Sequence, residues 1–325
     1  MSKKMRALIT GGAGFIGSQV ARHFLRAGYG VYLYDSFVIY SVPDPASVQP
    51  NFAFRLKDIF PSIHLIRGST LHKDFLRRTL TEIAPDVIVH MAAMPLPAIA
   101  IDYTEEAFQS ILNSTLNILE IMRDAQTQAR LVYISSSMVY GDFQTPEADE
   151  DEHPKNPKDI YGAFKLAGEV VVSTYGRNYG IDFVTCRPSA VYGPTDTNQR
   201  VIQKFIQAAL HDKPLVLDGD GSMQLDFTYV EDTALAIYLA ATTPAASGKV
   251  YNVTRGESRS LKDLIEIIRK HVPHTTVVHR EAPKYMPVRG SLSIARARRD
   301  LGYEPRVSLE EGVRLYVEHL RNNPY

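Results

Sequence analysis

Residues 7–35 read ALITGGAGFIGSQVARHFLRAGYGVYLYD, and this stretch decides the fold. The apolar run at 7–9 predicts a short buried strand, the apolar stripe of 15–28 predicts an amphipathic helix, and 31–34 predict a second strand. Three glycines lie between the first strand and the first turn of the helix: Gly11, Gly14 and Gly17. At this spacing the backbone can approach a diphosphate closely, and the N-terminus of the helix points partial positive charge at it. The stretch therefore predicts a dinucleotide site, with an ordinary glycine-rich turn as the alternative.

The acidic residue that ends the second strand, Asp35, indicates which dinucleotide binds. It follows the glycines by about 20 residues, where a carboxylate accepts hydrogen bonds from ribose hydroxyls and repels a 2′-phosphate. Ser36 and Phe37 come next, and neither side chain could neutralise that phosphate. The sequence therefore predicts NAD rather than NADP as the cofactor.

The composition is that of an ordinary globular protein. The chain has 325 residues, 45% hydrophobic and 22% charged, which is long enough for one large domain and a smaller lobe. Its formal net charge is zero, so we expect no nucleic-acid-binding surface. No apolar run is long enough to span a membrane, and no signal-peptide core precedes the first strand. We therefore expect a cytoplasmic protein without membrane contact.

The only cysteine, Cys186, excludes an intramolecular disulfide and a cysteine-rich metal site. It lies within an apolar strand run, which favours an inert core thiol over a reactive one. We expect no bound metal.

Strands and helices alternate through the first part of the chain. The apolar runs predict further strands at 63–66, 87–90, 131–134 and 183–186, and the helices between them are expected at 74–83, 103–122 and 160–179. This alternation predicts an α/β fold, with a Rossmann-type doubly wound parallel sheet that carries helices on both faces. Residues 36–62 show no clear strand and contain several prolines, so we expect a long connection over the cofactor edge.

After Pro194 the segments become shorter and more mixed. The patterns predict short strands at 215–217, 227–230, 250–253 and 275–279, and helices at 198–210, 231–241, 261–271, 294–301 and 309–320. We expect residues 1–193 and about 228–255 to form the dinucleotide-binding domain. Residues of about 194–227 and 256–325 are expected to form a smaller mixed α/β substrate-binding lobe.

Tyr161 and Lys165 open the predicted helix at 160–179 and are four residues apart, so their side chains share one face. A free tyrosine has a pKa of about 10, which must fall by about 3 units for the phenol to act as a base near pH 7. A nearby ammonium group and a nicotinamide cation both favour the phenolate. The spacing alone also fits a tyrosine and a lysine on a solvated helix surface.

Three serines, at 135–137, end the predicted strand at 131–134. The carboxyl ends of parallel strands are where α/β sheets bind ligands. A hydroxyl here could donate to the same oxygen that Tyr161 deprotonates, whereas the alternative is a common serine-rich turn.

Six motifs occur in a characteristic order: GGAGFIG at 11–17, HMAA at 90–93, SSSMVYG at 135–141, Tyr161 with Lys165, RPSAVYGP at 187–194 and DFTYVED at 226–232. With them the chain resembles the extended short-chain dehydrogenase/reductase family, the NAD-dependent nucleotide-sugar epimerases and dehydratases. The resemblance runs from about residue 5 to residue 305. Together the motifs are specific for the family, and they are much less specific for the substrate.

The resemblance implies a catalytic site of Ser136, Tyr161 and Lys165. The cofactor contacts that it implies come from the opening motif and from later strand ends: Gly11, Gly14, Phe15, Ile16, Gly17, Asp35, Ser69 and Ala92, with Tyr161 and Lys165. The candidates for substrate contacts are Met94, Ser137, Arg200 and Arg289. Arg289 is a plausible clamp because a guanidinium matches phosphate oxygens bidentately. Arg200, Gln199 and Lys204 are weaker candidates, for which a solvated helix face is the alternative. Asn113 either orients the lysine through water or is a helix-surface amide.

Several positions depart from the pattern of the family. Ala190, Met223 and Leu225 stand where an Asn, a Gln and an Arg often contact the substrate, which puts the usual UDP-sugar binding mode in doubt. Ser69 replaces an Asp that usually meets the adenine.

The resemblance also bears on the reaction. Dehydratases and decarboxylases of the family carry acids directly after the catalytic Ser or Thr, where this chain has Ser137 and Met138, so elimination is not expected. The favoured reaction is C4 epimerisation of a nucleotide-diphosphate sugar. Tyr161 takes the hydroxyl proton, Ser136 steadies the oxygen, hydride passes to NAD⁺, and the 4-keto sugar turns over before the hydride returns.

Two other readings stay open. A dehydrogenase or 4-ketoreductase would use the same residues with net redox turnover. A non-enzymatic dinucleotide-sensing protein would usually lack the intact Ser–Tyr–Lys set. By analogy with the family, the helices at 103–122 and 160–179 pair with those of a second subunit in a homodimer.

Overall fold

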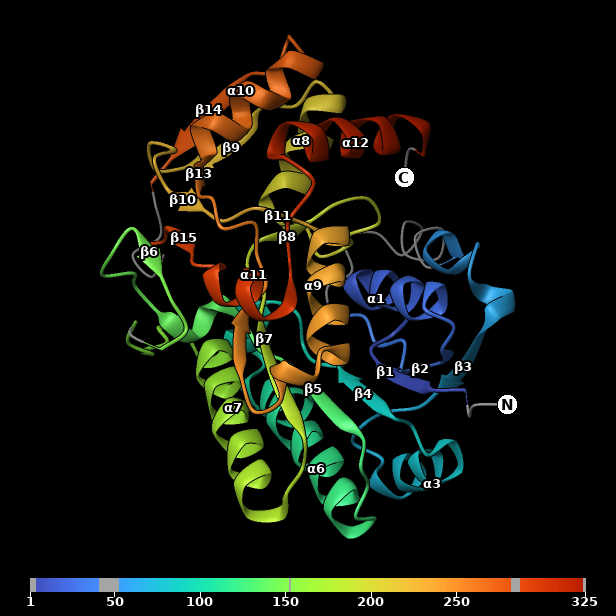
Figure 1. Ribbon diagram of the computed structural model, residues 1–325. Helices are drawn as coiled ribbons and strands as arrows, with labels where there is room; N and C mark the ends of the chain where they lie inside the picture. Colours follow the sequence, from blue (N-terminus) through green and yellow to red (C-terminus); the bar gives the residue numbers. More distant parts are fainter. Residues whose placement is uncertain (1–3, 41–52, 152, 282–286, 324–325) are drawn as a thin grey trace.

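The computed structural model describes residues 4–40, 53–151, 153–281 and 287–323. Its centre is a seven-stranded sheet in the order β12-β7-β5-β4-β1-β2-β3, in which every neighbouring pair is parallel (Figure 1). The strands are β1 (Arg6–Thr10), β2 (Gly30–Asp35), β3 (Ile63–Arg67), β4 (Val87–His90), β5 (Arg130–Ile134), β7 (Phe183–Arg187) and β12 (Val250–Asn252). The predicted doubly wound α/β fold is confirmed.

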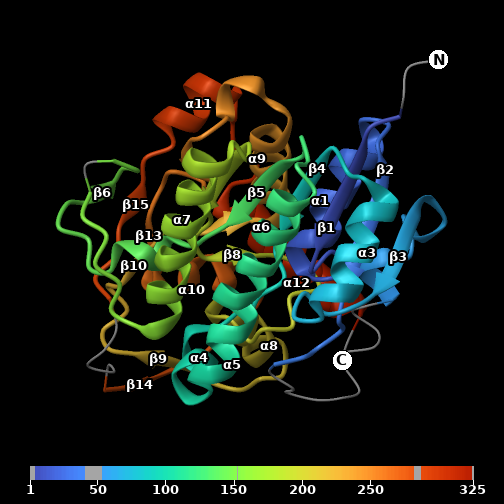
Figure 2. The same ribbon diagram turned by 90° about the horizontal axis from the view of Figure 1, so that it is seen from below.

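Helices cover both faces of the sheet (Figure 1). One face carries α1 (Phe15–Arg26), α9 (Val230–Thr242) and α11 (Ala295–Leu301), and the other carries α3 (Lys73–Ile83), α6 (Ser114–Asp124) and α7 (Ile160–Tyr179). Successive side chains of a strand point to opposite faces, so Ile9 belongs to the first core and Leu8 to the second. Figure 2 shows α6 and α7 side by side.

The prediction of one helix over 103–122 is wrong in detail. The chain forms α4 (Pro97–Asp102), α5 (Thr104–Ala107) and a π-helical stretch, η2 (Phe108–Asn113), before α6. The hydroxyls of Ser114 and Thr115 donate to carbonyls four residues earlier, at 2.5 and 2.6 Å, and also lie 3.3 and 3.1 Å from Nε2 of the buried His90. Hydroxyls that bind the helix backbone compete with its regular hydrogen bonds, and π-helical stretches occur mostly as single turns within an α-helix, as here.

A smaller lobe lies at the carboxyl ends of the strands, at the top of Figure 1. It holds the parallel pair β9 (Leu215–Asp218) and β14 (Val277–Arg280), the antiparallel pair β10 (Gln224–Leu225) and β13 (Arg259–Ser260), and α8 (Val201–Leu210), α10 (Leu261–His271) and α12 (Leu309–Asn322). The three helices pack on one apolar core. The helix predicted from residue 198 begins only at Val201, because Gln199 has a φ of 53°, which is outside the helical region.

Two segments cross the expected boundary between domain and lobe. Ile294, Ala297 and Tyr303, which were assigned to the lobe, pack in the core of the large sheet with α9. Two short strands, β8 (Val191–Tyr192) and β11 (Thr228–Tyr229), pair with each other and contribute to the core of the lobe. The division into two domains therefore stays a prediction.

The long connection expected at 36–62 falls partly outside the described residues, which resume at residue 53. Within the described part of the chain, no helix has the length and apolar character needed to cross a membrane.

Candidate active site

A cavity of about 1090 Å³ opens at the carboxyl ends of the parallel strands, where loops of the sheet meet the lobe. This exceeds the about 300–1,000 Å³ typical of a site for one small ligand. Its floor includes the ends of β1 and β4, the neighbours between which the strand order reverses, and ligands of open α/β sheets bind at such a switch point. Apart from the weaker candidates, every residue assigned above to catalysis, cofactor or substrate lines this cavity, and their individual roles stay predictions.

The glycine turn has no room for side chains. A Cβ at Gly17 would lie 2.4 Å from the carbonyl oxygen of Gly11, so this glycine lets α1 pack directly on the turn. Gly11 has a φ of 66°, and a Cβ there would lie 2.9 Å from the amide nitrogen of Ala92. The chain that follows β4 therefore requires a glycine at position 11; that a diphosphate also requires it stays a prediction.

The N-terminus of α1 faces the cavity. Gly14 is its N-cap, and the next three residues, Phe15, Ile16 and Gly17, all line the cavity. The first N–H groups of a helix have no partner within it, and the helix dipole adds partial positive charge there. The turn thus offers the donors that a diphosphate needs, which fits a dinucleotide.

Asp35 stands at the end of β2 in the same wall. Its Oδ2 accepts a hydrogen bond from the amide of Ala13 at 3.0 Å, and its Oδ1 accepts one from the amide of Phe37 at 2.8 Å. Burial raises the pKa of this carboxyl, whereas these two hydrogen bonds and the positive charge of Arg55 act in the opposite direction. A carboxylate fixed beside the glycine turn fits the ribose of NAD.

The catalytic candidates come together at the start of α7 and the end of β5. The side chain of Asp159 caps α7 by accepting a hydrogen bond from the amide of Gly162 at 2.8 Å, which places Tyr161 in the first turn. Tyr161 is buried against Met94 and Ile111, and Ser136 lines the same cavity at the end of β5. A phenol and a hydroxyl that face one ligand-sized cavity can hold and move one proton of a bound alcohol.

Lys165 does not contact the Tyr161 hydroxyl directly. Its Nζ donates to the carbonyl oxygen of Ile134 at 2.8 Å and lies 5.8 Å from the centroid of the Tyr161 ring. Burial lowers the pKa of Lys165 to about 8, which the negative charge of Glu169 partly offsets. Burial raises the pKa of Tyr161, against the effects of Arg200 and Ser136. The expected lowering of the tyrosine pKa is therefore not present in the protein alone, because desolvation outweighs the nearby positive charge.

A buried ion pair between Arg187 and Glu169 supports the catalytic candidates on α7 and at the end of β5. The Arg187 guanidinium donates to both carboxylate oxygens of Glu169, at 2.9 and 2.6 Å, and Ser135 donates to the same carboxylate at 2.5 Å. Glu169 lies one turn after Lys165 on α7, whereas Ser135 directly precedes Ser136. The pair thus fixes the end of β5 against α7. The sequence analysis missed it, although the spacing from Lys165 to Glu169 was a usable signal.

Two arginines mark the part of the cavity nearer to the lobe. The Arg289 guanidinium donates to the carbonyl oxygen of Ser137 at 2.8 Å and lies 5.3 Å from the centroid of the Phe143 ring. Burial lowers its pKa to about 10, so it is still a cation near neutral pH. Arg200 pairs with the buried carboxylate of Asp196 at 2.8 Å. A nucleotide diphosphate would find complementary charge here.

Apart from Arg200, the weaker candidates lie elsewhere. The amide of Asn113 donates to the side chain of Gln109 at 2.6 Å, which fits the helix-surface alternative. Gln199 and Lys204 are not among the residues that line the cavity.

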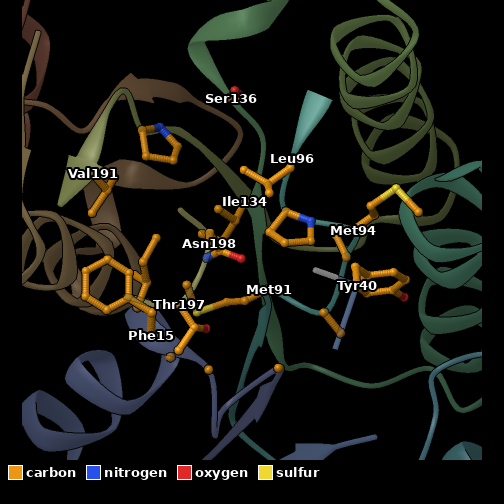
Figure 3. A pocket seen from close by; sticks show the side chains of 18 of the residues that line it. Phe15, Tyr40, Met91, Met94, Leu96, Ile134, Ser136, Val191, Thr197 and Asn198 are labelled. Carbon is orange, nitrogen blue, oxygen red and sulfur yellow. The ribbon is translucent and has the colours of Figure 1, made fainter. Parts of the chain in front are cut away.

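Residues that the sequence analysis missed line the cavity as well: Tyr40, Arg55, Thr197 and Asn198. Figure 3 shows Thr197 and Asn198 near Phe15 and Met91, with Tyr40 and Met94 on another wall. Tyr40, Arg55 and Thr197 lie outside the predicted strands and helices, and Asn198 lies at the start of one, so the sequence pattern does not place them in the site.

Comparison with known proteins agrees with this geometry. The model of the NAD dependent epimerase/dehydratase family matches residues 7–254. A UDP-glucose 4-epimerase of Mycolicibacterium smegmatis is 31% identical over 98% of this chain and 99% of its own. The crystal structure of a UDP-glucuronic acid 4-epimerase from Bacillus cereus, in complex with UDP-glucuronic acid and NAD, has a TM-score of 0.89 at 28% identity and covers 98% of this chain and 99% of its own.

The chain is also similar to part of a larger protein. A trifunctional UDP-glucose 4,6-dehydratase, epimerase and reductase of Arabidopsis thaliana is 29% identical over 99% of this chain. This chain spans about half of that enzyme, 48% of its length.

Proposed function

We propose that this chain, which belongs to the NAD dependent epimerase/dehydratase family, is a nucleotide-sugar epimerase that inverts C4 of the sugar. The observation that carries the proposal is the convergence of Ser136, Tyr161 and Lys165 on the cavity that the glycine turn and Asp35 also line. Acid–base groups and a dinucleotide site then face one space, as oxidation and reduction of a bound alcohol require.

Each residue has a separate task in this proposal. Tyr161 removes the proton from the C4 hydroxyl and later returns it, while Ser136 holds the C4 oxygen by a hydrogen bond. Lys165 adds positive charge beside the phenol and binds the cofactor ribose. NAD, when bound, supplies the hydride acceptor and donor that the chain itself lacks. Asp35 and the N-terminus of α1 hold the other end of the cofactor.

The residues after Ser136 argue against elimination of water. Ser137 donates to the hydroxyl of Ser189 at 3.1 Å, and the Met138 sulfur contacts the Arg289 guanidinium. Neither side chain is an acid or base that could remove a proton from C5 near neutral pH. An epimerase or a simple dehydrogenase therefore fits better than a dehydratase.

The substrate is proposed to be a nucleotide-diphosphate sugar. Arg289 and Arg200 supply positive charge for the diphosphate, and Met94 and Ser137 line the cavity close to the catalytic tyrosine. The cavity is large enough for the cofactor and a second ligand together. The relatives named above act on UDP-sugars, and we extend this to the substrate class but not to one nucleotide.

We also propose that two copies of the chain associate through α4 to α7. Large apolar side chains are exposed on these elements: Ile101, Tyr103, Phe108 and Val170, with exposed fractions from 38% to 57%. Exposed apolar patches of this kind mark interaction sites, and a pair of identical subunits is the commonest arrangement. The mass in solution tests this proposal, and a monomer at all concentrations would contradict it. A cytoplasmic location stays a prediction from the sequence.

The function is tested by a substrate screen. UDP-, GDP-, CDP- and dTDP-sugars are incubated with the protein and NAD⁺, the products are resolved by NMR, and reduced nicotinamide is followed by absorbance. An epimerase gives an inverted sugar without accumulation of NADH. Steady accumulation of NADH would favour the dehydrogenase alternative, and no turnover of any sugar would favour a dinucleotide-sensing protein.

A further inference from the structure

Arg55 connects two walls of the cavity that are distant in sequence. It belongs to the short helical stretch at 53–56, is only 9% exposed and lines the cavity. Its Nε donates to the carbonyl oxygen of Thr195 at 3.1 Å. Its Nη2 donates to the same oxygen and to the hydroxyl of Thr197 at 3.3 Å. The guanidinium therefore bridges the segment after β2 to the loop after β8.

The same guanidinium lies within electrostatic range of Asp35, whose carboxyl is stabilised in its charged form by Arg55. Asp35 and Arg55 both line the cavity beside the glycine turn. A dinucleotide held by Asp35 and by the N-terminus of α1 thus occupies the part of the cavity that Arg55 and Thr197 border.

The loop that Arg55 holds is strained. Thr195 has a φ of 73°, which is unfavourable for a β-branched residue, and Gln199 has a φ of 53°. The hydroxyl of Thr195 is buried, and it has no hydrogen-bond partner among the residues that the structure describes. Backbone strain of this kind persists only where the surroundings fix it, and it is common at ligand clamps.

The other side of the loop is fixed by Asp196. Its buried carboxylate accepts hydrogen bonds from the amide of Asn198 at 3.1 Å and from the Arg200 guanidinium at 2.8 Å. The loop is therefore held by Arg55 through Thr195 and Thr197, and by Asp196 through Asn198 and Arg200. Between these two supports, Thr197 and Asn198 line the cavity (Figure 3).

We propose that Arg55 is a positioning residue that holds the 195–198 loop against the cofactor part of the cavity and thereby slows the release of NAD. An epimerase leaves its cofactor unchanged after each cycle, so one NAD must stay bound through both hydride transfers. To this extent the inference rests on the proposed function. The release of NAD, however, can be measured without any sugar, so the two proposals can fail separately.

The test uses the full chain loaded with NAD, with release followed after mixing with an excess of fluorescent ethenoadenine NAD. In Arg55→Met we expect release about tenfold faster than in the wild type, the effect of losing a charge-assisted hydrogen-bond bridge. Arg55→Lys keeps the charge and one donor and is expected to give an intermediate rate. Thr197→Val removes only the hydroxyl acceptor, and release is expected to rise about threefold.

Arg22→Met is the matched control. Arg22 donates to the backbone carbonyl of Arg55 at 2.7 Å and pairs with Asp58, so its loss weakens the same segment without removing the Arg55 guanidinium. We expect its release rate to match the wild type. Equal acceleration in Arg22→Met and Arg55→Met would overturn the proposal, because the effect would then be structural. Wild-type release in a folded Arg55→Met, or in Arg55→Lys and Thr197→Val if the first variant does not fold, would overturn it as well.

Discussion

The cofactor part and the substrate part of the cavity are built in different ways. The cofactor part consists of backbone at the ends of adjacent parallel strands, where Gly11 packs against Ala92 and Gly17 against the turn itself. The substrate part consists of side chains from segments far apart in the chain, such as Arg200 after β8 and Arg289 before β15 (Ser291–Leu292). A side chain added at Gly11 or Gly17 would meet the backbone at under 3 Å, so a substitution in the first part disturbs the turn itself. The side chains of the second part can be replaced without changing the backbone of the sheet.

The largest expected effect is a loss of turnover without a loss of bound NAD. In Tyr161→Phe we expect turnover of the identified sugar to fall by about a thousandfold or more, because the acid–base group is lost. The content of bound NAD should stay at the wild-type value, since the glycine turn and Asp35 are unchanged. Turnover and NAD content are measured on the same preparation. Tyr175→Phe, on α7 but outside the cavity, is the control and should behave as the wild type. A Tyr161→Phe protein with full activity would contradict the proposed mechanism.

A smaller effect is expected from the substrate part alone. Arg289→Met should raise KM for the nucleotide sugar about 10- to 100-fold, the range for loss of a hydrogen-bonded charge, with little change in kcat. Steady-state kinetics at saturating NAD measure both constants. Arg280→Met, in an exposed ion pair with Asp218 on the lobe, is the control. If KM is unchanged in Arg289→Met, the diphosphate binds elsewhere.

A substitution in the cofactor part is expected to lower the stability of the protein together with its affinity for NAD. In Gly17→Ala the new Cβ would meet the Gly11 carbonyl at 2.4 Å, so we expect the free energy of unfolding to fall by about 1–3 kcal/mol. Affinity for NAD should fall with it because the first turn of α1 must move. Gly30→Ala is the control, since its nearest neighbour is 3.5 Å away. Denaturant unfolding and NAD titration test both effects, and equal stability of the two variants would show that the turn is not tightly packed.

The last expected effect is a pH dependence of stability. Burial lowers the pKa of Lys165 to about 8 from its ordinary value of 10.5. Between these values the unfolded chain keeps the proton that the folded protein has lost, so the free energy of unfolding rises with pH, by at most about 1.4 kcal/mol per pH unit. The difference between the wild type and Lys165→Met, both without NAD, should therefore grow in favour of the wild type from pH 8 to pH 10. A constant difference would mean that Lys165 is not desolvated.

The sequence predicts the fold and the cofactor part because both depend on local patterns. Continuous apolar runs predict the buried parallel strands, and the glycine spacing predicts the turn. The π-helical stretch was not predicted, and the contacts of Ser114 and Thr115 with the buried His90 beside it join residues that are distant in the chain. The bridge from Arg55 to Thr195 also joins residues that are distant in the chain, and no periodic pattern in the sequence predicts such a contact. For the same reason, the roles of Arg200 and Arg289 stay predictions.

The two parts meet at Tyr161, whose pKa is raised by burial in the protein alone. The proposed mechanism requires the bound cofactor to lower the pKa of Tyr161, because the nicotinamide cation adds the positive charge that Lys165 alone does not supply.

The most direct test is an ultraviolet titration of the phenolate, with and without NAD⁺, as the difference between the wild type and Tyr161→Phe. We predict that Tyr161 ionises above pH 10 without the cofactor and near pH 7 with it, a fall of at least about 3 units. The same pKa in both forms would contradict the account.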